Sequence, residues 1–213
     1  MRVIRCAGRD ELTPDETAAV RAATRACGVM LFPTDTLYAL GVDPVSAASL
    51  GALFRLKGRD PGKPVPVLLA DASLVDHYAA AIPARWRVLM KRFWPGPLTL
   101  LFPAIPGLSP GICSASGKVA LRVPGNALCR AVLRAAGGSL TGTSANRAGA
   151  GGTSEPEIAL RELGSGIDLV VDTGTLAPSP ASSLLDIDEW GVVTILRAGA
   201  ISEAALSGPL VAI

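Results

Sequence analysis

The sequence predicts an α/β domain, and three observations support this fold class. Short apolar runs alternate with helix-like segments along the whole chain, the pattern of strands interleaved with helices. The 213 residues are 49% hydrophobic and 18% charged, a composition typical of a folded chain that buries a sizeable core. Finally, no internal repeat and no long linker divides the sequence.

The first helix and strand follow from a cap and an apolar run. The segment TPDE at 13–16 is a capping box with proline at the first helical position, which predicts a helix over 14–27. Gly28 is expected to end this helix. The run VMLF at 29–32 then predicts a short buried strand.

The middle of the chain continues the alternation. A helix is predicted over 46–57 because apolar side chains gather on one side, with Gly58 as its stop. The runs VPVLL at 65–69 and LTLLF at 98–102 predict strands. The region 71–92 between them predicts two short helices.

The C-terminal half repeats these signals. VALRV at 119–123 predicts a strand, and Asn126 opens the next helix. Ser154 and Glu157 have capping-box spacing, which predicts a helix that ends at Gly164. The remaining predicted strands are 169–172, 183–187 and 192–197. The expected loops, where α/β folds build their sites, are 103–118, 143–156 and 173–182.

Several classes of protein are excluded. The formal net charge is only +2, so any site for a polyanion must be local. The four cysteines are scattered with no nearby histidine, which argues against a metal site or disulfides and for free thiols in a reducing cytoplasm. The N-terminus has charges where an export signal needs an apolar core. The uncharged stretch between Arg92 and Lys118 contains five prolines, so it is not a membrane span.

Three catalytic patterns come close and fail. GLSPG at 107–111 resembles a nucleophile elbow, but Pro110 has no N–H for the oxyanion hole. The segment 58–64 imitates a P-loop, yet it is one residue short and carries proline where Mg²⁺ needs a hydroxyl. GAGGTS at 149–154 lacks the third glycine of a dinucleotide fingerprint.

A set of polar residues at strand ends and in Gly/Pro loops is more informative. Its members are Thr34, Asp35, Thr36, Lys57, Arg59, Lys63, Arg122, Thr141, Thr143, Ser144, Asn146, Ser182, Ser183 and Arg197. Taken singly, Thr34 can cap a turn, and Arg122 or Lys63 can face water. Taken together, clustered cations without matching acids suit a triphosphate, and catalysis by positioning and electrostatics rather than by a covalent nucleophile.

The same residues carry a family resemblance. PTDTLYALG, KGRDPGKPVPVLL, FWPGPLTLLF, VALRVP, TSAN, SSLLD and ILRAGAI occur in this order. In order and spacing they resemble the signature blocks of the YrdC-domain family of threonylcarbamoyl-AMP synthases, over roughly residues 10–203.

The resemblance implies a fold and a reaction. The fold is one YrdC-like domain over 1–213, a twisted mixed β-sheet with flanking helices around a large basic cavity and no C-terminal accessory domain. The reaction joins L-threonine, bicarbonate and ATP, with Mg²⁺, into threonylcarbamoyl-AMP and pyrophosphate. The product serves the threonylcarbamoyl modification of adenosine 37 in tRNA, so tRNA and a transferase complex are the implied partners.

The resemblance also implies residue roles. Lys57 and Arg59 act as catalytic cations at the ATP phosphates. The threonine-binding residues are Thr34, Arg122 and Ser182. The nucleotide-binding residues are Arg59, Lys63, Thr143, Ser144, Asn146 and Arg197.

Departures from the family pattern leave alternatives open. Ala39, Leu68 and Ser183 stand where many or some relatives carry glycine, histidine and threonine. One alternative is a YrdC-like module that binds RNA without turnover, although the chain has only 4% aromatic residues for base stacking. Another is carbamoyl-adenylate chemistry on a different acceptor. The retained KGR and SAN blocks favour the synthase.

Overall fold

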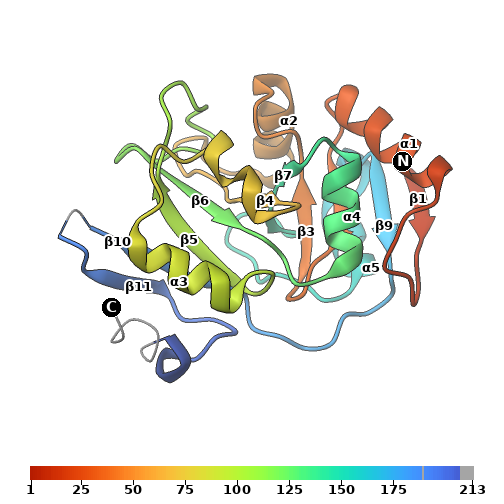
Figure 1. The fold of residues 1–213 in the computed structure, drawn as a ribbon. Helices are drawn as coiled ribbons and strands as arrows, with labels where there is room; N and C mark the ends of the chain where they lie inside the picture. The colour runs from red at the N-terminus through yellow and green to blue at the C-terminus, as the bar shows by residue number, and fades with distance from the viewer. Residues whose placement is uncertain (189, 207–213) are drawn as a thin grey trace.

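The computed structural model describes residues 1–188 and 190–206 and contains two mixed sheets (Figure 1). The first sheet has the order β1 (Arg2–Arg5), β9 (Leu169–Asp172), β2 (Met30–Pro33), β3 (Tyr38–Gly41) and β8 (Thr143–Ser144). The second has the order β11 (Val193–Arg197), β10 (Ser183–Ile187), β5 (Leu98–Pro103), β6 (Lys118–Arg122), β4 (Val67–Leu69) and β7 (Ser139–Thr141). The predicted α/β class is confirmed.

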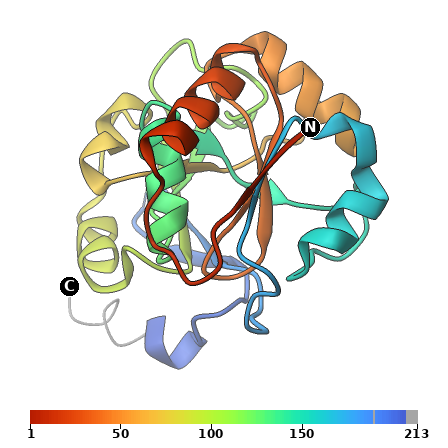
Figure 2. The same cartoon turned by 90° about the vertical axis from the view of Figure 1, so that its right-hand side faces the viewer.

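Helices cover the first sheet on both faces. The helices of the described residues are α1 (Pro14–Arg25), α2 (Ala47–Lys57), α3 (Ala84–Phe93), α4 (Ala127–Ala135) and α5 (Pro156–Leu163), with 3₁₀ helices η1 (Ala72–His77) and η2 (Gly164–Gly166). Of these, α3 packs against the second sheet, where the Trp86 Nε1 donates to the Leu101 carbonyl of β5 at 2.6 Å. Figure 2 shows α1 and α4 on one side of the strands and α2 and α5 on the other. The segment 173–182 crosses from β9 to β10 along the bottom of Figure 1 and so connects the two sheets.

Strand β2 is buried along its whole length because both of its faces are covered. Met30 and Phe32 pack into the cluster that contains Val132 of α4, whereas Leu31 packs into the cluster that contains Leu53 of α2. Alternate side chains of a strand point to opposite faces, so a strand between two helical layers is apolar at every position. This explains why VMLF has no alternating pattern.

The first predicted helix is confirmed, with an earlier end. The Thr13 hydroxyl accepts from the Glu16 N–H at 3.3 Å, and the Thr13 N–H donates to the Glu16 carboxylate at 2.8 Å. The helix ends at Arg25, and Cys27 rather than Gly28 takes the left-handed conformation, with φ 57°. Gly28 as the stop was therefore wrong. Its missing side chain instead leaves room for Asp168, which a Cβ would approach to 3.1 Å.

The later caps divide into confirmed and wrong predictions. Gly58 ends α2 in the left-handed conformation, and the Asn126 side chain caps α4 by accepting from the Cys129 N–H at 2.8 Å. The capping box at Ser154 is wrong, because α5 begins at Pro156 and the residue before it makes no side-chain cap. Proline is already shaped for the first helical position, so it sets the start of this helix.

Four strands of the described residues, β1, β3, β7 and β8, lie outside the predicted strand ranges. β1 is an edge strand with two apolar residues between two arginines, β3 follows a four-residue turn, and β7 and β8 have only three and two residues. The two short helices in 71–92 are η1 and α3. The region 173–182 is free of helix and strand, as expected, whereas 143–156 begins with β8.

The structure also bears on the uncharged stretch after Arg92 and on the four cysteines. Within the described residues, no helix has the length and apolarity needed to span a bilayer. The uncharged stretch after Arg92 forms β5 and the loop that follows. The four cysteines are free thiols, as predicted.

Candidate active site

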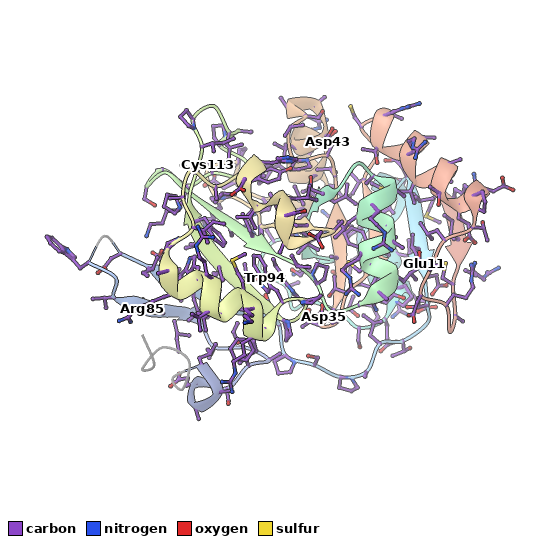
Figure 3. All side chains as sticks on the ribbon, in the orientation of Figure 1. Glu11, Asp35, Asp43, Arg85, Trp94 and Cys113 are labelled. Atoms are coloured by element: carbon purple, nitrogen blue, oxygen red, sulfur yellow. The ribbon has the colours of Figure 1, made fainter. Side chains whose placement is uncertain are left out.

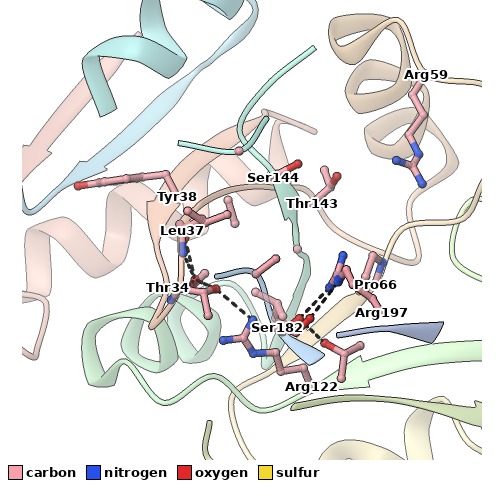
Figure 4. A pocket seen from close by; sticks show the side chains of 17 residues that line it. Thr34, Leu37, Tyr38, Arg59, Pro66, Arg122, Thr143, Ser144, Ser182 and Arg197 are labelled. Carbon is pink, nitrogen blue, oxygen red and sulfur yellow. Dashed lines mark hydrogen bonds between the residues drawn. The ribbon is translucent and has the colours of Figure 1, made fainter. Parts of the chain in front are cut away.

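A cavity of about 250 Å³ lies between the two sheets (Figure 4). Strands β3 and β8 of the first sheet form one wall, and residues of β4, β5, β6 and β11 form the other. Its lining is Thr34, Thr36, Leu37, Tyr38, Ala39, Arg59, Pro66, Leu68, Thr99, Arg122, Gly142, Thr143, Ser144, Gly152, Ala181, Ser182 and Arg197. The charged side chains of this lining are three arginines.

Arg122 at the end of β6 is buried, at 5% exposure, and held from three directions. Its Nε donates to the Gly96 carbonyl at 3.0 Å, one Nη donates to the Asp35 carboxylate at 2.5 Å, and the other lies 3.4 Å from the Thr36 hydroxyl. A guanidinium has five N–H groups, so two have no bond among the described residues. Burial lowers the pKa of Arg122, and the charge of Asp35 opposes that shift.

Thr34 both lines the cavity and shapes the turn between β2 and β3. Its hydroxyl accepts from the N–H groups of Thr36 and Leu37, at 3.1 and 3.2 Å, and lies 2.7 Å from the Leu37 carbonyl to which it donates. The turn-capping interpretation of Thr34 is therefore correct for the structure. Its place in the cavity wall is observed as well.

Ser182 and Arg197 form a second fixed corner. The Ser182 hydroxyl accepts from an Arg197 Nη at 2.9 Å and lies 2.8 Å from the Thr99 hydroxyl, while the Arg197 Nε donates to the Ser182 carbonyl at 2.9 Å. Partial burial and the charge of Arg122 both lower the pKa of Arg197. Two cations thus lie near each other on one side of the cavity, an arrangement that favours an anion.

Lys57 does not line the cavity. It is 2% exposed, and its ammonium donates to the carbonyls of Ser144 and Asn146, both at 2.6 Å, and to the Asn146 side chain at 3.3 Å. Burial, reinforced by the charge of Arg59, lowers the pKa of Lys57 to about 8. In this structure Lys57 ties the end of α2 to the loop that starts at Ser144.

The two other cations of the loop at 57–63, Arg59 and Lys63, are arranged differently from Lys57. The Arg59 guanidinium bonds the carbonyls of Lys63 and Pro64, at 2.9 and 3.1 Å, and it approaches the cavity from above in Figure 4. Lys63 is exposed and outside the lining. Asn146 is buried, bonded to the Ser144 hydroxyl and the Ala150 carbonyl, and also outside the lining.

The structure therefore brings together most of the predicted site. Inside the lining are Thr34, Arg59, Arg122, Thr143, Ser144, Ser182 and Arg197. Lys57, Lys63 and Asn146 lie outside it. Sequence reasoning missed Thr99 and Tyr38 as wall residues; a hydroxyl within the apolar run LTLLF was the available signal for Thr99. The Tyr38 hydroxyl donates to the Gly174 carbonyl at 2.8 Å and so ties segment 173–182 to β3.

The cavity offers little for a resident metal ion. Among the described residues there is no group of three or more side chains of the kinds His, Cys, Asp and Glu that could hold one, and the lining contains no carboxylate. Mg²⁺ is bound in proteins through one or two carboxylates together with phosphate oxygens. The residues present do not fit Mg²⁺ as a protein-held cofactor. The predicted large basic cavity also stays a prediction, since 250 Å³ is below the range of roughly 300–1,000 Å³ typical of ligand pockets.

Fold and cavity together define a class: a mixed α/β protein whose two sheets enclose a polar cavity, with arginines from one loop and two strands at its wall. The chain belongs to the Sua5/YciO/YrdC family, whose model, described as "Telomere recombination", matches residues 22–199. This confirms the predicted family.

Relatives and solved structures agree with the assignment. The chain is 32% identical over 207 residues to the threonylcarbamoyl-AMP synthase of Bacillus subtilis, covering 94% of this chain and 60% of that protein. It resembles the crystal structure of Pyrococcus abyssi Sua5 complexed with L-threonine, with TM-score 0.91 and 24% identity over 98% of this chain and 61% of the other. It also resembles Escherichia coli YciO, with TM-score 0.80 and 22% identity over 96% and 98%.

The coverage and the sequence identity determine what these similarities show. The chain spans about three fifths of the length of the B. subtilis and P. abyssi proteins. The structural likenesses, at 24% and 22% identity, show the shared fold.

Proposed function

We propose that this protein is an L-threonylcarbamoyladenylate synthase, a nucleotidyltransferase that forms threonylcarbamoyl-AMP and pyrophosphate from L-threonine, bicarbonate and ATP. The observation that carries the proposal is the convergence of distant sequence blocks on one cavity: Thr34, Arg122 and Ser182 meet Arg59, Ser144 and Arg197 there. The name of the B. subtilis relative, which matches 94% of this chain, supports the same activity.

The Arg122 end of the cavity is the proposed threonine site. The two N–H groups of Arg122 without a bond among the described residues suit a carboxylate, because a guanidinium binds both carboxylate oxygens at once. Thr34 and Ser182 lie beside it in the wall. The complex of P. abyssi Sua5 with L-threonine supports threonine as a ligand of this fold.

The Arg59 end is the proposed nucleotide site. Arg59 and Ser144 contact ATP there, with Thr143 in the wall, and Arg197 reaches the nucleotide from beside Ser182, where the two sites adjoin. The exposed Lys63 acts on the phosphates from outside, through solvent. Lys57 and Asn146 act by holding the loop that carries Ser144. Mg²⁺ enters as the counter-ion of ATP and is part of that substrate.

The chemistry proceeds in two steps. Bicarbonate loses hydroxide to give CO₂, and the threonine amine attacks the carbon of that CO₂. The amine proton leaves with the hydroxide as water, which gives a carbamate. A carbamate oxygen then attacks the α-phosphorus of ATP, and the bond to the β-phosphate oxygen breaks to release pyrophosphate. Both steps gather negative charge, which fixed arginines stabilise without reorganisation.

Product use and location follow from the same proposal. The adenylate passes to a transferase complex that modifies adenosine 37 of tRNA in the cytoplasm. Direct tRNA binding by this chain is part of the competing interpretation, an RNA-binding module without turnover.

The test is pyrophosphate release from ATP, with L-threonine and bicarbonate omitted in turn. The proposal expects release only when both are present and weak release when L-serine replaces L-threonine. ATP binding without threonine-dependent release would contradict the synthase. RNA titration would then test the binding module.

A further inference from the structure

We propose that Asp35 is a positioning residue for the threonine site, acting through Arg122; this rests on the proposed function. Asp35 lies in the turn between β2 and β3, and Figure 3 shows it near the middle of the molecule, below the gap between α3 and α4. It is absent from the cavity lining although its neighbours Thr34 and Thr36 belong to it. Asp35 therefore faces the side of Arg122 away from the ligand space.

The contact between the two side chains is short and largely dry. The Asp35 Oδ1 accepts from an Arg122 Nη at 2.5 Å, and the two side chains are 17% and 6% exposed. The two other contacts of the guanidinium are neutral: the Gly96 carbonyl at 3.0 Å and the Thr36 hydroxyl at 3.4 Å. All three bonds have a charged donor, and the bond to Asp35, whose acceptor is charged as well, is the strongest of them in this poorly hydrated place. Asp35 thus fixes the direction in which the free N–H groups of Arg122 point.

The second carboxylate oxygen strengthens this interpretation. The Asp35 Oδ2 is buried and has no hydrogen-bond partner among the described residues. A buried acceptor without a donor is costly, and native structures contain few of them. Since no other hydrogen bond within residues 1–188 and 190–206 disperses the charge of Asp35, its attraction is directed at Arg122.

Gly125 lies against the Asp35 Oδ2, so a substitution there tests the role of this carboxylate independently. A Cβ built at Gly125 would lie 3.0 Å from the Asp35 Oδ2 and 3.4 Å from the Asp35 Cβ. Gly125 does not have a positive φ, so alanine strains no backbone there. Gly125→Ala therefore displaces the Asp35 carboxylate, although neither Asp35 nor Arg122 is itself substituted.

A competing role is that of a counter-charge. An anion beside Arg122 also repels a threonine carboxylate, so its removal could tighten binding. The two roles predict opposite signs for the Michaelis constant (KM) of threonine in Asp35→Asn, which keeps the shape and one acceptor but loses the charge.

The experiment measures kcat and KM for L-threonine and for ATP, together with thermal unfolding. We expect Asp35→Ala to raise the threonine KM about tenfold and Asp35→Asn about threefold, with the ATP KM within about twofold, as for loss of one charge-assisted bond. Gly125→Ala should change the threonine KM in the same direction. Asp186→Asn is the matched control: it breaks the 2.6 Å ion pair to Lys118 at the other end of β6 and should leave the threonine KM unchanged.

Three results would overturn the proposal. A lower threonine KM in Asp35→Asn would assign the counter-charge role, equal rises for both substrates would remove the link to threonine, and a lower kcat and unfolding temperature at constant KM would make Asp35 structural only. If Asp35→Ala does not fold, Asp35→Asn and Gly125→Ala decide. Wild-type protein without threonine-dependent turnover is a separate result, because it contradicts the proposed function itself.

Discussion

The cations of the loop at 57–63 and the arginines of β6 and β11 differ in what holds them. In the loop, Lys57 is buried and its ammonium bonds the segment after β8, Arg59 bonds carbonyls of its own loop, and Lys63 is exposed. In the strands, Arg122 is held by Asp35, 87 residues away in the sequence, and Arg197 by Ser182, 15 residues away. The three cations that are neighbours in the sequence thus lie in different surroundings, whereas Arg122 and Arg197, which are far apart in the sequence, both line the cavity.

This difference separates a cation that stabilises the fold from cations that can bind a ligand. A buried ammonium with three protein acceptors stabilises a loop, and it has no free N–H for a ligand. A guanidinium that protein acceptors hold through some of its N–H groups can still donate its remaining N–H groups to a ligand. We therefore expect substitutions in the strands to change substrate binding and Lys57 substitutions to change stability first.

Arg122→Ala should have the largest effect on activity. We expect kcat/KM for threonine to fall about 100-fold or more and the ATP KM to change by less than about threefold, as for truncation of a buried, hydrogen-bonded charge. Steady-state pyrophosphate release measures both. Arg122→Lys, which keeps the charge and loses the planar fork, should be intermediate. Equal losses for both substrates would refute the assignment of this end to threonine.

Lys57→Met should reduce the free energy of unfolding by about 2 kcal/mol, because three loop acceptors lose their donor. Urea unfolding followed by tryptophan fluorescence measures this. Arg59→Ala is the control in the same loop: its stability should change by less than about 0.5 kcal/mol, while its ATP KM rises. The reverse pattern would mean that Lys57, not Arg59, meets the nucleotide.

The difference in stability between the wild type and Lys57→Met should depend on pH, and the shifted pKa of Lys57 gives the direction. The pKa of Lys57 is about 8 when folded against 10.5 ordinarily, so between these values the unfolded chain holds a proton that the folded chain has released. The stability of the wild type relative to Lys57→Met should therefore rise from pH 8 to pH 10.5. The rise is complete above 10.5 and absent below 8. A flat or falling difference over this window would contradict the buried charge.

Ser182 and Ser183 form a neighbouring pair with different surroundings. Ser182 faces the cavity and bonds Arg197, whereas the Ser183 hydroxyl bonds the backbone of Ile201 at 3.0 and 3.1 Å. Each change to alanine should cost about 1 kcal/mol of stability. We expect the threonine KM to rise roughly fivefold in Ser182→Ala alone, since only that serine fixes the cavity corner. A similar rise in Ser183→Ala would contradict this distinction.

Lys63→Ala should have the smallest effect. An exposed charge acts on ATP through solvent, so the ATP KM should rise about twofold at low salt. The effect should fade toward 1 M salt, where the screening length is about 3 Å. A large, salt-independent rise would mean that Lys63 contacts the phosphates directly.

The sequence predicted this site in part, for physical reasons. Arg122 stood out as a charge inside an apolar strand, but its partner Asp35 lies 87 residues away and is found only once β6 is placed against the β2–β3 turn. The burial of Lys57 had a local signal, because it lies on the same side of α2 as Leu53 and Phe54. A lysine on an apolar helix face is a candidate for burial with carbonyl partners.

The fold was predictable where local signals were strong. The Thr13 cap and the glycine after α2 fixed helix boundaries from a few residues. Strands β1 and β8 are short and depend on partners distant in the sequence, since β1 pairs with β9 and β8 with β3. Pairing of this kind comes from the tertiary fold and leaves little pattern in a short segment.

The most direct test of the account titrates L-threonine and ATP separately into the wild type, Arg122→Lys and Arg59→Ala by calorimetry. The account predicts that Arg122→Lys weakens threonine binding and retains ATP binding, and that Arg59→Ala does the reverse. Weakening of both ligands by the same factor in both variants would contradict two distinct ends of one cavity.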